Sequence, residues 1–119
     1  MKHLLAGGRQ LAVTRAVESL VEAKPSPDTD GFAVFDPKAP AGKAKSDAGA
    51  GSGVGAQPFK ESIVFMIGGG SYLEHQSLQE LAGELNKKSP AVNRSILYGA
   101  TEVLSAGEFV AQLSTLAKA

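Results

Sequence analysis

The chain has no cysteine, no tryptophan and no excess of charge of either sign, and these absences exclude several classes of function. Without cysteine there is no disulfide framework and no cysteine-based metal site, which fits a reducing compartment. The 12 basic residues balance the 12 acidic ones, so no net field draws the chain to nucleic acid or to an anionic membrane. We therefore expect no nucleic-acid partner. The placement of the two histidines argues against a metal site of another kind, and we expect no cofactor.

Long hydrophobic runs are also missing. No apolar run approaches the roughly 20 residues that a membrane span requires. Arg9 interrupts the apolar N-terminus too soon for the core of a signal peptide. We expect a soluble, unsecreted protein without a membrane span.

Large apolar side chains are scarce in residues 37–58. This segment consists mainly of alanine, glycine, serine, lysine and proline, and Val54 is its only larger aliphatic residue. Such a composition buries too little apolar surface to offset the entropy lost on ordering. We interpret the segment as a flexible linker or loop, which separates a block at residues 1–36 from a block at residues 59–119.

The first block predicts one helix, from about Thr14 to Ala23. Thr14 is the expected N-cap, and Pro25 ends the helix because the residue before a proline avoids helical dihedral angles. The apolar residues at near-helical spacing are Val13, Val17, Leu20 and Val21.

The last block begins with an apolar, β-branched strand, Ile63–Ile67, that runs into three consecutive glycines. Ser71 can cap the helix that follows, from about Tyr72 to Leu85, and Glu74 can reach back to complete a capping box. We interpret the glycines as a tight strand-to-helix turn that permits positive φ and close packing; they are Gly68, Gly69 and Gly70.

A second strand-to-helix unit follows. Strand Ser95–Tyr98 leads through Gly99 to another capping box, made by Ser105 and Glu108. The last helix carries one apolar face, and we expect its final two leucines to cover the sheet rather than to bind a partner helix. That face consists of Phe109, Val110, Leu113 and Leu116.

Two β-then-α units predict an α/β fold with parallel strands joined by a right-handed crossover. Two strands alone leave open edges, and parallel sheets need helices on both faces. The sequence therefore predicts a partial parallel sheet that residues outside this chain complete. An alternative is a small domain that completes its sheet by dimerising.

The three glycines before a helix start also allow a second interpretation, a nucleotide-binding α/β fragment with a phosphate at the turn. No Lys-Ser or Lys-Thr follows the glycines, as a P-loop requires, and the spacing of a dinucleotide motif is missing. A general acid/base cluster of His75, Glu74 and Glu102 is disfavoured as well, because His75 is expected to face solvent. We expect no catalytic residues.

Four stretches occur in an order typical of one protein family: Leu11–Val17, Phe35–Lys38, Ile63–Leu78, and Ile96–Glu102 with the helix Phe109–Leu116. They resemble the C-terminal end of the SM (Sec/Munc) family, clasp-shaped cytosolic regulators of SNARE-driven membrane fusion. Within the family, Tyr72–Gln76 and Ile96–Gly99 are most similar to the Sly branch, which serves traffic between endoplasmic reticulum and Golgi.

The resemblance implies a place for each block. Residues 1–36 would end the family's helical third domain, residues 37–58 would be a linker, and residues 59–119 would be the C-terminal part of its α/β second domain. The implied partners are syntaxin-class SNAREs and SNARE bundles, bound by the full-length protein, and the rest of the SM chain.

A scaffold role is implied for this segment, with no enzymatic activity and with peripheral association to endoplasmic reticulum and Golgi membranes from the cytoplasm. No SNARE-contact residue can be assigned to the chain. The expected structural signature consists of Gly68, Gly69, Gly70, Ser71, Tyr72, Glu74, Gly99, Ser105 and Glu108.

Overall fold

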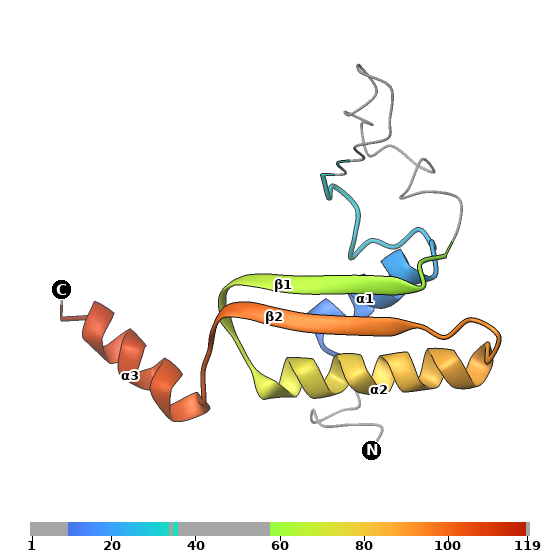
Figure 1. Cartoon of the computed structure of the whole chain (residues 1–119). Coiled ribbons are helices and arrows are strands. Elements are labelled where there is room, and N and C mark those ends of the chain that lie inside the picture. Colours follow the sequence, from blue (N-terminus) through green and yellow to red (C-terminus); the bar gives the residue numbers. More distant parts are fainter. Residues whose placement is uncertain (1–9, 34, 36–57, 119) are drawn as a thin grey trace. The chain divides into compact units, whose positions relative to one another are not determined.

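The computed structural model describes residues 10–33, 35 and 58–118 (Figure 1). The linker expected at residues 37–58 lies outside the described residues except for Pro58. The chain divides into two units, Met1–Lys60 and Glu61–Ala119. In the described ranges, no helix is long and apolar enough to cross a membrane.

The first unit contains helix α1, Ala12–Val21. The helix begins after Leu11 without a side-chain cap, so the prediction that Thr14 is the N-cap is wrong. Thr14 instead lies three residues before Val17 and seven before Val21, on the stripe that the helix buries, and only 2% of it is exposed.

Polar contacts fix the end of α1. Ala23 adopts a left-handed backbone with φ of 54°, which ends the helix just before the predicted proline stop. Arg15 on the helix pairs with Asp28 at 3.0 Å. The amide of Phe59 donates to the carbonyl of Val21 at 3.0 Å, so the chain returns to the helix end before the second unit begins.

The second unit has the order β1 (Glu61–Gly70), α2 (Tyr72–Lys88), β2 (Ser95–Val103) and α3 (Ala106–Leu116). Strands β1 and β2 pair in parallel, which confirms the predicted fold class. Ile63 lies opposite Leu97 and Phe65 opposite Gly99. Figure 1 shows α2 alongside β2, on the side away from β1.

Both strands are longer than predicted. The glycines do not leave the sheet at once: β1 continues to Gly70, with an irregularity between Met66 and Gly69 at which Gly68 adopts φ of +123°. Gly99 likewise lies within β2 instead of ending it. A Cβ at Gly99 would lie 3.2 Å from the ring of Phe65, so the glycine makes room for that ring.

The core of this unit lies on one face of the sheet. Helix α2 buries a stripe at i, i+3, i+4 and i+7, as predicted, and it packs on β2. Ile96 of β2 is 3% exposed. The buried residues of α2 are Leu78, Leu81, Ala82 and Leu85.

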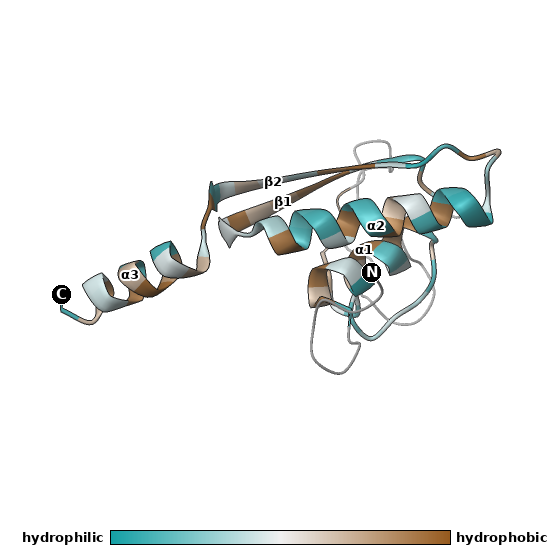
Figure 2. Ribbon diagram, turned by 90° about the horizontal axis from the view of Figure 1, so that it is seen from below, coloured by the Kyte–Doolittle hydropathy of each residue, from teal (hydrophilic) through white to brown (hydrophobic). Residues whose placement is uncertain are grey.

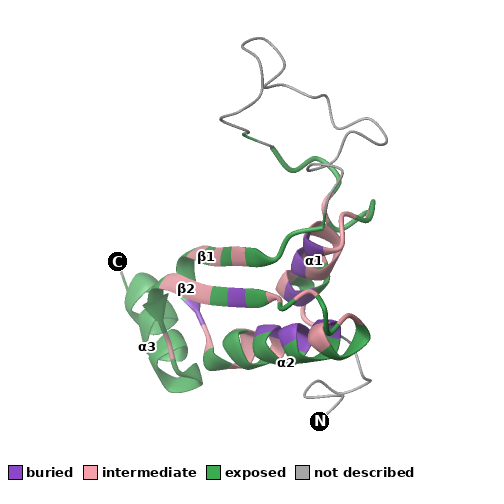
Figure 3. Cartoon of the chain, turned by 45° about the vertical axis from the view of Figure 1, so that its right-hand side comes forward, coloured by how far each residue is buried: buried purple, intermediate pink, exposed green. Residues whose placement is uncertain are grey.

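The opposite face of the sheet, called here the outer face, is apolar and uncovered. It consists of Ile63 (77% exposed), Phe65 (62%), Ile67 (93%) and Leu97 (61%). Helix α3 does not cover it: the helix buries none of its residues, and Figure 3 shows it exposed along its length. The expectation that Leu113 and Leu116 cover the sheet is therefore wrong for this chain, in which they are 50% and 70% exposed.

The hydropathy of the residues shows that the exposed parts of this unit are apolar. Figure 2 shows apolar residues along both strands and along one side of α3. Parallel sheets occur almost only with both faces covered, so an apolar sheet face left open marks a structure that other residues complete.

Two glycine-to-alanine substitutions test the backbone conformations assigned to α2 and β1. At both positions there is room for a Cβ, but only one of the two glycines has a positive φ. Gly83 lies inside α2, and a Cβ there would meet nothing within 4 Å. Gly83→Ala should raise the free energy of unfolding by about 0.5–1 kcal/mol, because alanine loses less backbone entropy in a helix. Urea unfolding followed by far-UV circular dichroism measures the change.

Gly68→Ala is the matched control. A Cβ at Gly68 also meets nothing within 4 Å, but the backbone there has φ of +123°. The same substitution should therefore destabilise by about 1–3 kcal/mol. Equal effects at the two positions would contradict the assigned backbone of the glycine turn.

Candidate site at the strand-to-helix turn

Among the described residues, a connected group of polar side chains surrounds the turn from β1 into α2. Ser71 is the N-cap of α2 in extended conformation, and its hydroxyl accepts from the amide of Glu74 at 3.4 Å. The carboxylate of Glu74 accepts in return from the amide of Ser71 at 3.2 Å. The predicted capping box is therefore present, and α2 begins at Tyr72 as expected.

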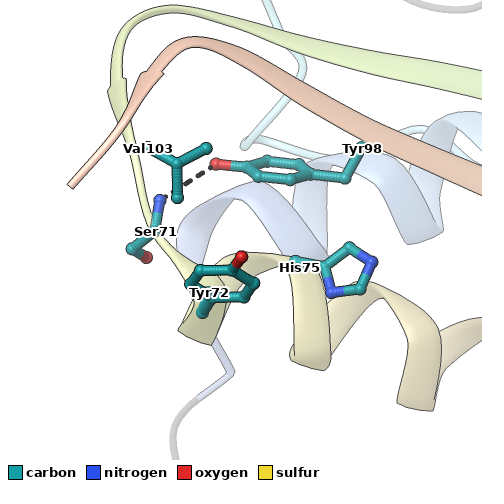
Figure 4. Close-up of a pocket in the computed structure, with 5 residues that line it drawn as sticks. All are labelled: Ser71, Tyr72, His75, Tyr98 and Val103. Atoms are coloured by element: carbon teal, nitrogen blue, oxygen red, sulfur yellow. Dashed lines mark hydrogen bonds between the residues drawn. The ribbon is translucent and has the colours of Figure 1, made fainter. Parts of the chain in front are cut away.

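A tyrosine from β2 joins this capping box. The hydroxyl of Tyr98 donates to Oε2 of Glu74. It also accepts from the amide of Ser71 at 3.3 Å, as the dashed line in Figure 4 marks. Burial, followed by the hydrogen bond with Glu74, raises the pKa of Tyr98 above its ordinary value of 10.0. The helix start is thus tied to the second strand as well as to the first.

Sequence reasoning missed this function of Tyr98. The available signal was alternation along β2: Tyr98 lies two residues after the buried Ile96 and so shares its face of the sheet. A hydroxyl on the helix-covered face needs a polar partner. The cap residues at the start of that helix are the nearest ones.

The glycines allow close approach. A Cβ at Gly70 would overlap the Tyr98 hydroxyl and the Ala100 methyl, so only glycine fits there. A Cβ at Gly69 would lie 2.9 Å from a methyl carbon of Leu104. The carbonyl of Gly70 accepts from the amide of Leu104 at 3.0 Å, which extends the strand pairing to the last residue before the turn.

Three amides at the turn, those of Gly68, Ser71 and Glu74, donate to protein groups. The amide of Gly68 donates to Oγ1 of Thr101 at 3.1 Å. The amide of Ser71 donates to Glu74 and Tyr98, and the amide of Glu74 donates to Ser71. A phosphate at a helix start needs such donors free. The turn therefore does not support the alternative interpretation as a nucleotide-binding fragment.

A small pocket adjoins the turn. It has a volume of about 140 Å³ and is lined by Ser71, Tyr72, His75, Tyr98 and Val103. His75 is exposed, as expected, and its ring lies 6.2 Å from that of Tyr98 at a tilted angle of 52°. Figure 4 shows the ring of Tyr98 above and the ring of His75 below, with Tyr72 to their left.

The two glutamates near His75 have other partners. Glu74 is engaged in the cap, whereas the carboxylate of Glu102 accepts from the side chain of Gln112 at 3.1 Å. His75, Glu74 and Glu102, disfavoured above as an acid/base cluster, share no hydrogen bond among the contacts described. Within the described ranges, no cluster of three or more His, Asp or Glu residues could hold a metal ion.

The second predicted capping box, at the start of α3, is also present. Ser105 accepts from the amide of Glu108 at 3.3 Å and donates to its carboxylate from both amide and hydroxyl, each at 2.7 Å. Hydrogen bonds from the amide and then the hydroxyl of Ser105 lower the pKa of Glu108 below its ordinary value of 4.5. Helix α3 thus has its own cap, although it buries none of its residues.

Comparisons with known proteins place the whole chain in one group. Residues 7–112 match the model of the Sec1 family. The chain is 48% identical to the SEC1 family transport protein SLY1 of Arabidopsis thaliana over 99% of its length, and 38% identical to the human Sec1 family domain-containing protein 1 over 98%. It covers 17% and 16% of these relatives, respectively.

A solved structure agrees with these matches. The chain superposes on Sly1p, crystallised in complex with an N-terminal peptide of Sed5p, with a TM-score of 0.66 and 27% identity. The match covers 90% of this chain and 17% of Sly1p. The chain therefore spans about a sixth of the length of the relatives that it matches.

Removal of one hydroxyl tests the link between β2 and the helix cap. Tyr98→Phe should lower the free energy of unfolding by about 1 kcal/mol, because Glu74 loses a donor and the Ser71 amide loses an acceptor. Urea unfolding measures the loss. Tyr72→Phe is the matched control: this tyrosine is 79% exposed, and its substitution should leave stability unchanged. Equal effects of the two substitutions would contradict the bridging function of Tyr98.

The lowered pKa of Glu108 predicts a pH dependence of α3. A carboxylate whose pKa is depressed on folding stabilises the folded state above its ordinary pKa, and this contribution is lost as pH falls through the depressed value. Glu108 should therefore titrate below 4.5 in a carbon-detected NMR titration, and the Ser105 amide signal should shift with it. Ser105→Ala should move the titration toward 4.5. A Glu108 pKa at or above 4.5 in the unaltered chain would refute the cap.

Proposed function

Because this chain belongs to the Sec1 family, we propose that it is the C-terminal segment of a Sly-type SM protein, a regulator that binds syntaxin-class SNAREs and promotes vesicle docking and fusion between endoplasmic reticulum and Golgi. The observation that carries the proposal is 48% identity to a SLY1 transport protein over 99% of this chain.

The segment itself acts as a scaffold. An SM protein needs a rigid frame to hold SNARE-binding surfaces in place, and this chain contributes a strand pair with a helix on one face. Its open outer face and the exposed helix α3 are what a piece of a larger α/β sheet presents when it is viewed alone.

The proposed mechanism is not enzymatic. A protein that holds SNARE helices in the assembled arrangement lowers the entropic cost of forming their bundle. This needs no acid, base, metal or cofactor. It is also consistent with a turn at which the polar groups of Ser71, Glu74 and Tyr98 hold α2 and β2 together.

The boundaries and location follow from the same assignment. Residues 1–36 end the helical third domain, residues 37–58 form a linker, and residues 59–119 close the second domain. The complete protein would work in the cytoplasm, peripherally associated with endoplasmic reticulum and Golgi membranes. In this scheme the glycine turn and the two capping boxes are structural signatures and not contact sites.

A graft into a complete relative tests the proposal. The chimera consists of the A. thaliana SLY1 relative with its matching segment replaced by this chain. It should bind a syntaxin-class SNARE and accelerate SNARE-dependent liposome fusion. The 119-residue chain alone should do neither, and the relative without its matching segment should lose activity because its sheet is incomplete.

Two variants of the chimera provide the matched control. Leu85 is fully buried and its neighbour Glu84 is exposed. Leu85→Asp should abolish fusion activity by breaking the scaffold, whereas Glu84→Asp should retain it. Tight, saturable SNARE binding by the isolated chain would contradict the scaffold role. A folded chimera that binds no SNARE would contradict the assignment as a regulator.

A further inference from the structure

The pocket at the strand-to-helix turn lies at the carboxyl ends of both parallel strands. Ser71 follows the last residue of β1, Val103 is the last residue of β2, and both line the pocket. In α/β sheets, ligands bind in the crevice outside the carboxyl ends of the strands. The pocket therefore has the position of a ligand site in this class of fold, and its lining decides which chemistry it accepts.

Three aromatic rings line this pocket, which is called here the aromatic pocket. Tyr72 and His75 are three residues apart on α2 and so lie on the same side of the helix. Tyr98 comes from β2, and its ring lies 6.2 Å from that of His75 with a tilt of 52°. Figure 4 shows the three rings around the pocket. The face of an aromatic ring is electrostatically negative and attracts cations.

The ring of Tyr98 is held in place by the helix cap. Its hydroxyl donates to the carboxylate of Glu74 and accepts from the amide of Ser71 at 3.3 Å. The ring therefore needs no rearrangement to receive a ligand, which lowers the entropic cost of binding. The same contact fixes the carboxylate of Glu74 beside the hydroxyl end of the ring, where its charge favours a cation over an anion.

The distribution of charge in the second unit also favours a cation at this end of the sheet. Glu74 and Glu108 lie in the first turns of α2 and α3, and Glu102 is the last residue but one of β2. The last turn of α2 begins about 22 Å from Tyr72 at ~1.5 Å per residue, beyond the Debye length of about 8–10 Å. The described lysines and arginines of this unit are Lys87 and Lys88 in that last turn, Arg94 before β2 and Lys118 after α3.

The lining selects among ligands. An anion finds no lysine or arginine in the pocket, and three amides at the adjacent turn already donate to protein groups. A quaternary ammonium group has no donor for a carboxylate. A guanidinium group is planar, stacks on aromatic faces and donates hydrogen bonds from its edge. The volume of about 140 Å³ is below the ~300–1,000 Å³ of pockets for drug-sized ligands, so it suits the end of one side chain.

We propose that the aromatic pocket receives an arginine side chain from a protein partner. The guanidinium group lies against the rings of Tyr72, His75 and Tyr98, and its charge lies near the carboxylate of Glu74. The proposal goes beyond the function as a scaffold, because it gives this segment a contact with a partner. It does not depend on the Sly-type assignment, since all the groups that form the pocket belong to this chain.

Methyl NMR of the chimera described above tests the proposal, with the methyl signals of Val103 assigned by their loss in Val103→Ala. The probe is a capped pentapeptide with one arginine among glycines. The control peptide carries citrulline, which has a similar shape and no charge. The arginine peptide should shift the Val103 signals saturably and bind at least about fivefold more tightly than the citrulline peptide.

Three results would overturn the proposal: no saturable shift, equal affinity of the two peptides, or tighter binding of choline than of the arginine peptide. The last result would assign the pocket to a quaternary ammonium group. SNARE binding by the same chimera tests the proposed function separately, so the two proposals can fail independently.

Removal of one ring gives an independent readout. Tyr72 is 79% exposed, and Tyr72→Ala in the chimera should weaken binding of the arginine peptide at least about threefold. Phe109→Ala is the matched control, because it removes a ring on α3 that is 54% exposed and does not line the pocket. It should leave the affinity unchanged. Equal effects of the two substitutions would contradict the site, and the citrulline comparison decides the matter if Tyr72→Ala does not fold.

Discussion

The packing of α2 on β2 is the contact on which the second unit depends. Leu78 and Leu85 of the helix are fully buried, and Ile96 of the strand is nearly so. Burial of three such side chains contributes about 5–9 kcal/mol at ~1.5–3 kcal/mol each. Each polar contact of the turn contributes about 1 kcal/mol. The apolar contact between α2 and β2 therefore holds the helix against the sheet. The hydrogen bonds of the turn determine where the helix begins and how it is positioned along β2.

The polar contacts have a positional function because they fall at both ends of that apolar contact. Near the start of α2, Tyr98 ties the cap at Ser71 and Glu74 to β2. Near its end, Asn86 holds the residue that precedes β2. A helix fixed at both ends cannot slide along the strand, and a shift by one residue would break both sets of bonds as well as the leucine stripe. The register of α2 against β2 is thus determined three times over.

The elements were predictable where the signal is local. Both capping boxes are four-residue patterns, and the α2 stripe repeats with the helical period, so each could be identified without the rest of the fold. The ends of the strands were not predictable from Gly68 and Gly99. A glycine can mark a turn that ends a strand, or a position inside a strand at which a neighbouring group comes close to the backbone. The room that Phe65 takes above Gly99 arises only when β1 and β2 pair. The prediction that Thr14 is the N-cap of α1 was wrong for a similar reason. Threonine is typical of caps, but in the folded chain Thr14 lies on the buried stripe of α1.

The exposed apolar residues of this chain are best understood as an asymmetry rather than as a general lack of packing. Helix α2 covers the face of the sheet that carries Ile96, and two of its amide side chains hold the backbone of Arg94 and Ile96. The outer face, in contrast, leaves Ile63, Phe65 and Ile67 exposed. A parallel sheet presents such an open apolar face when one of its two layers of helices comes from residues outside this chain.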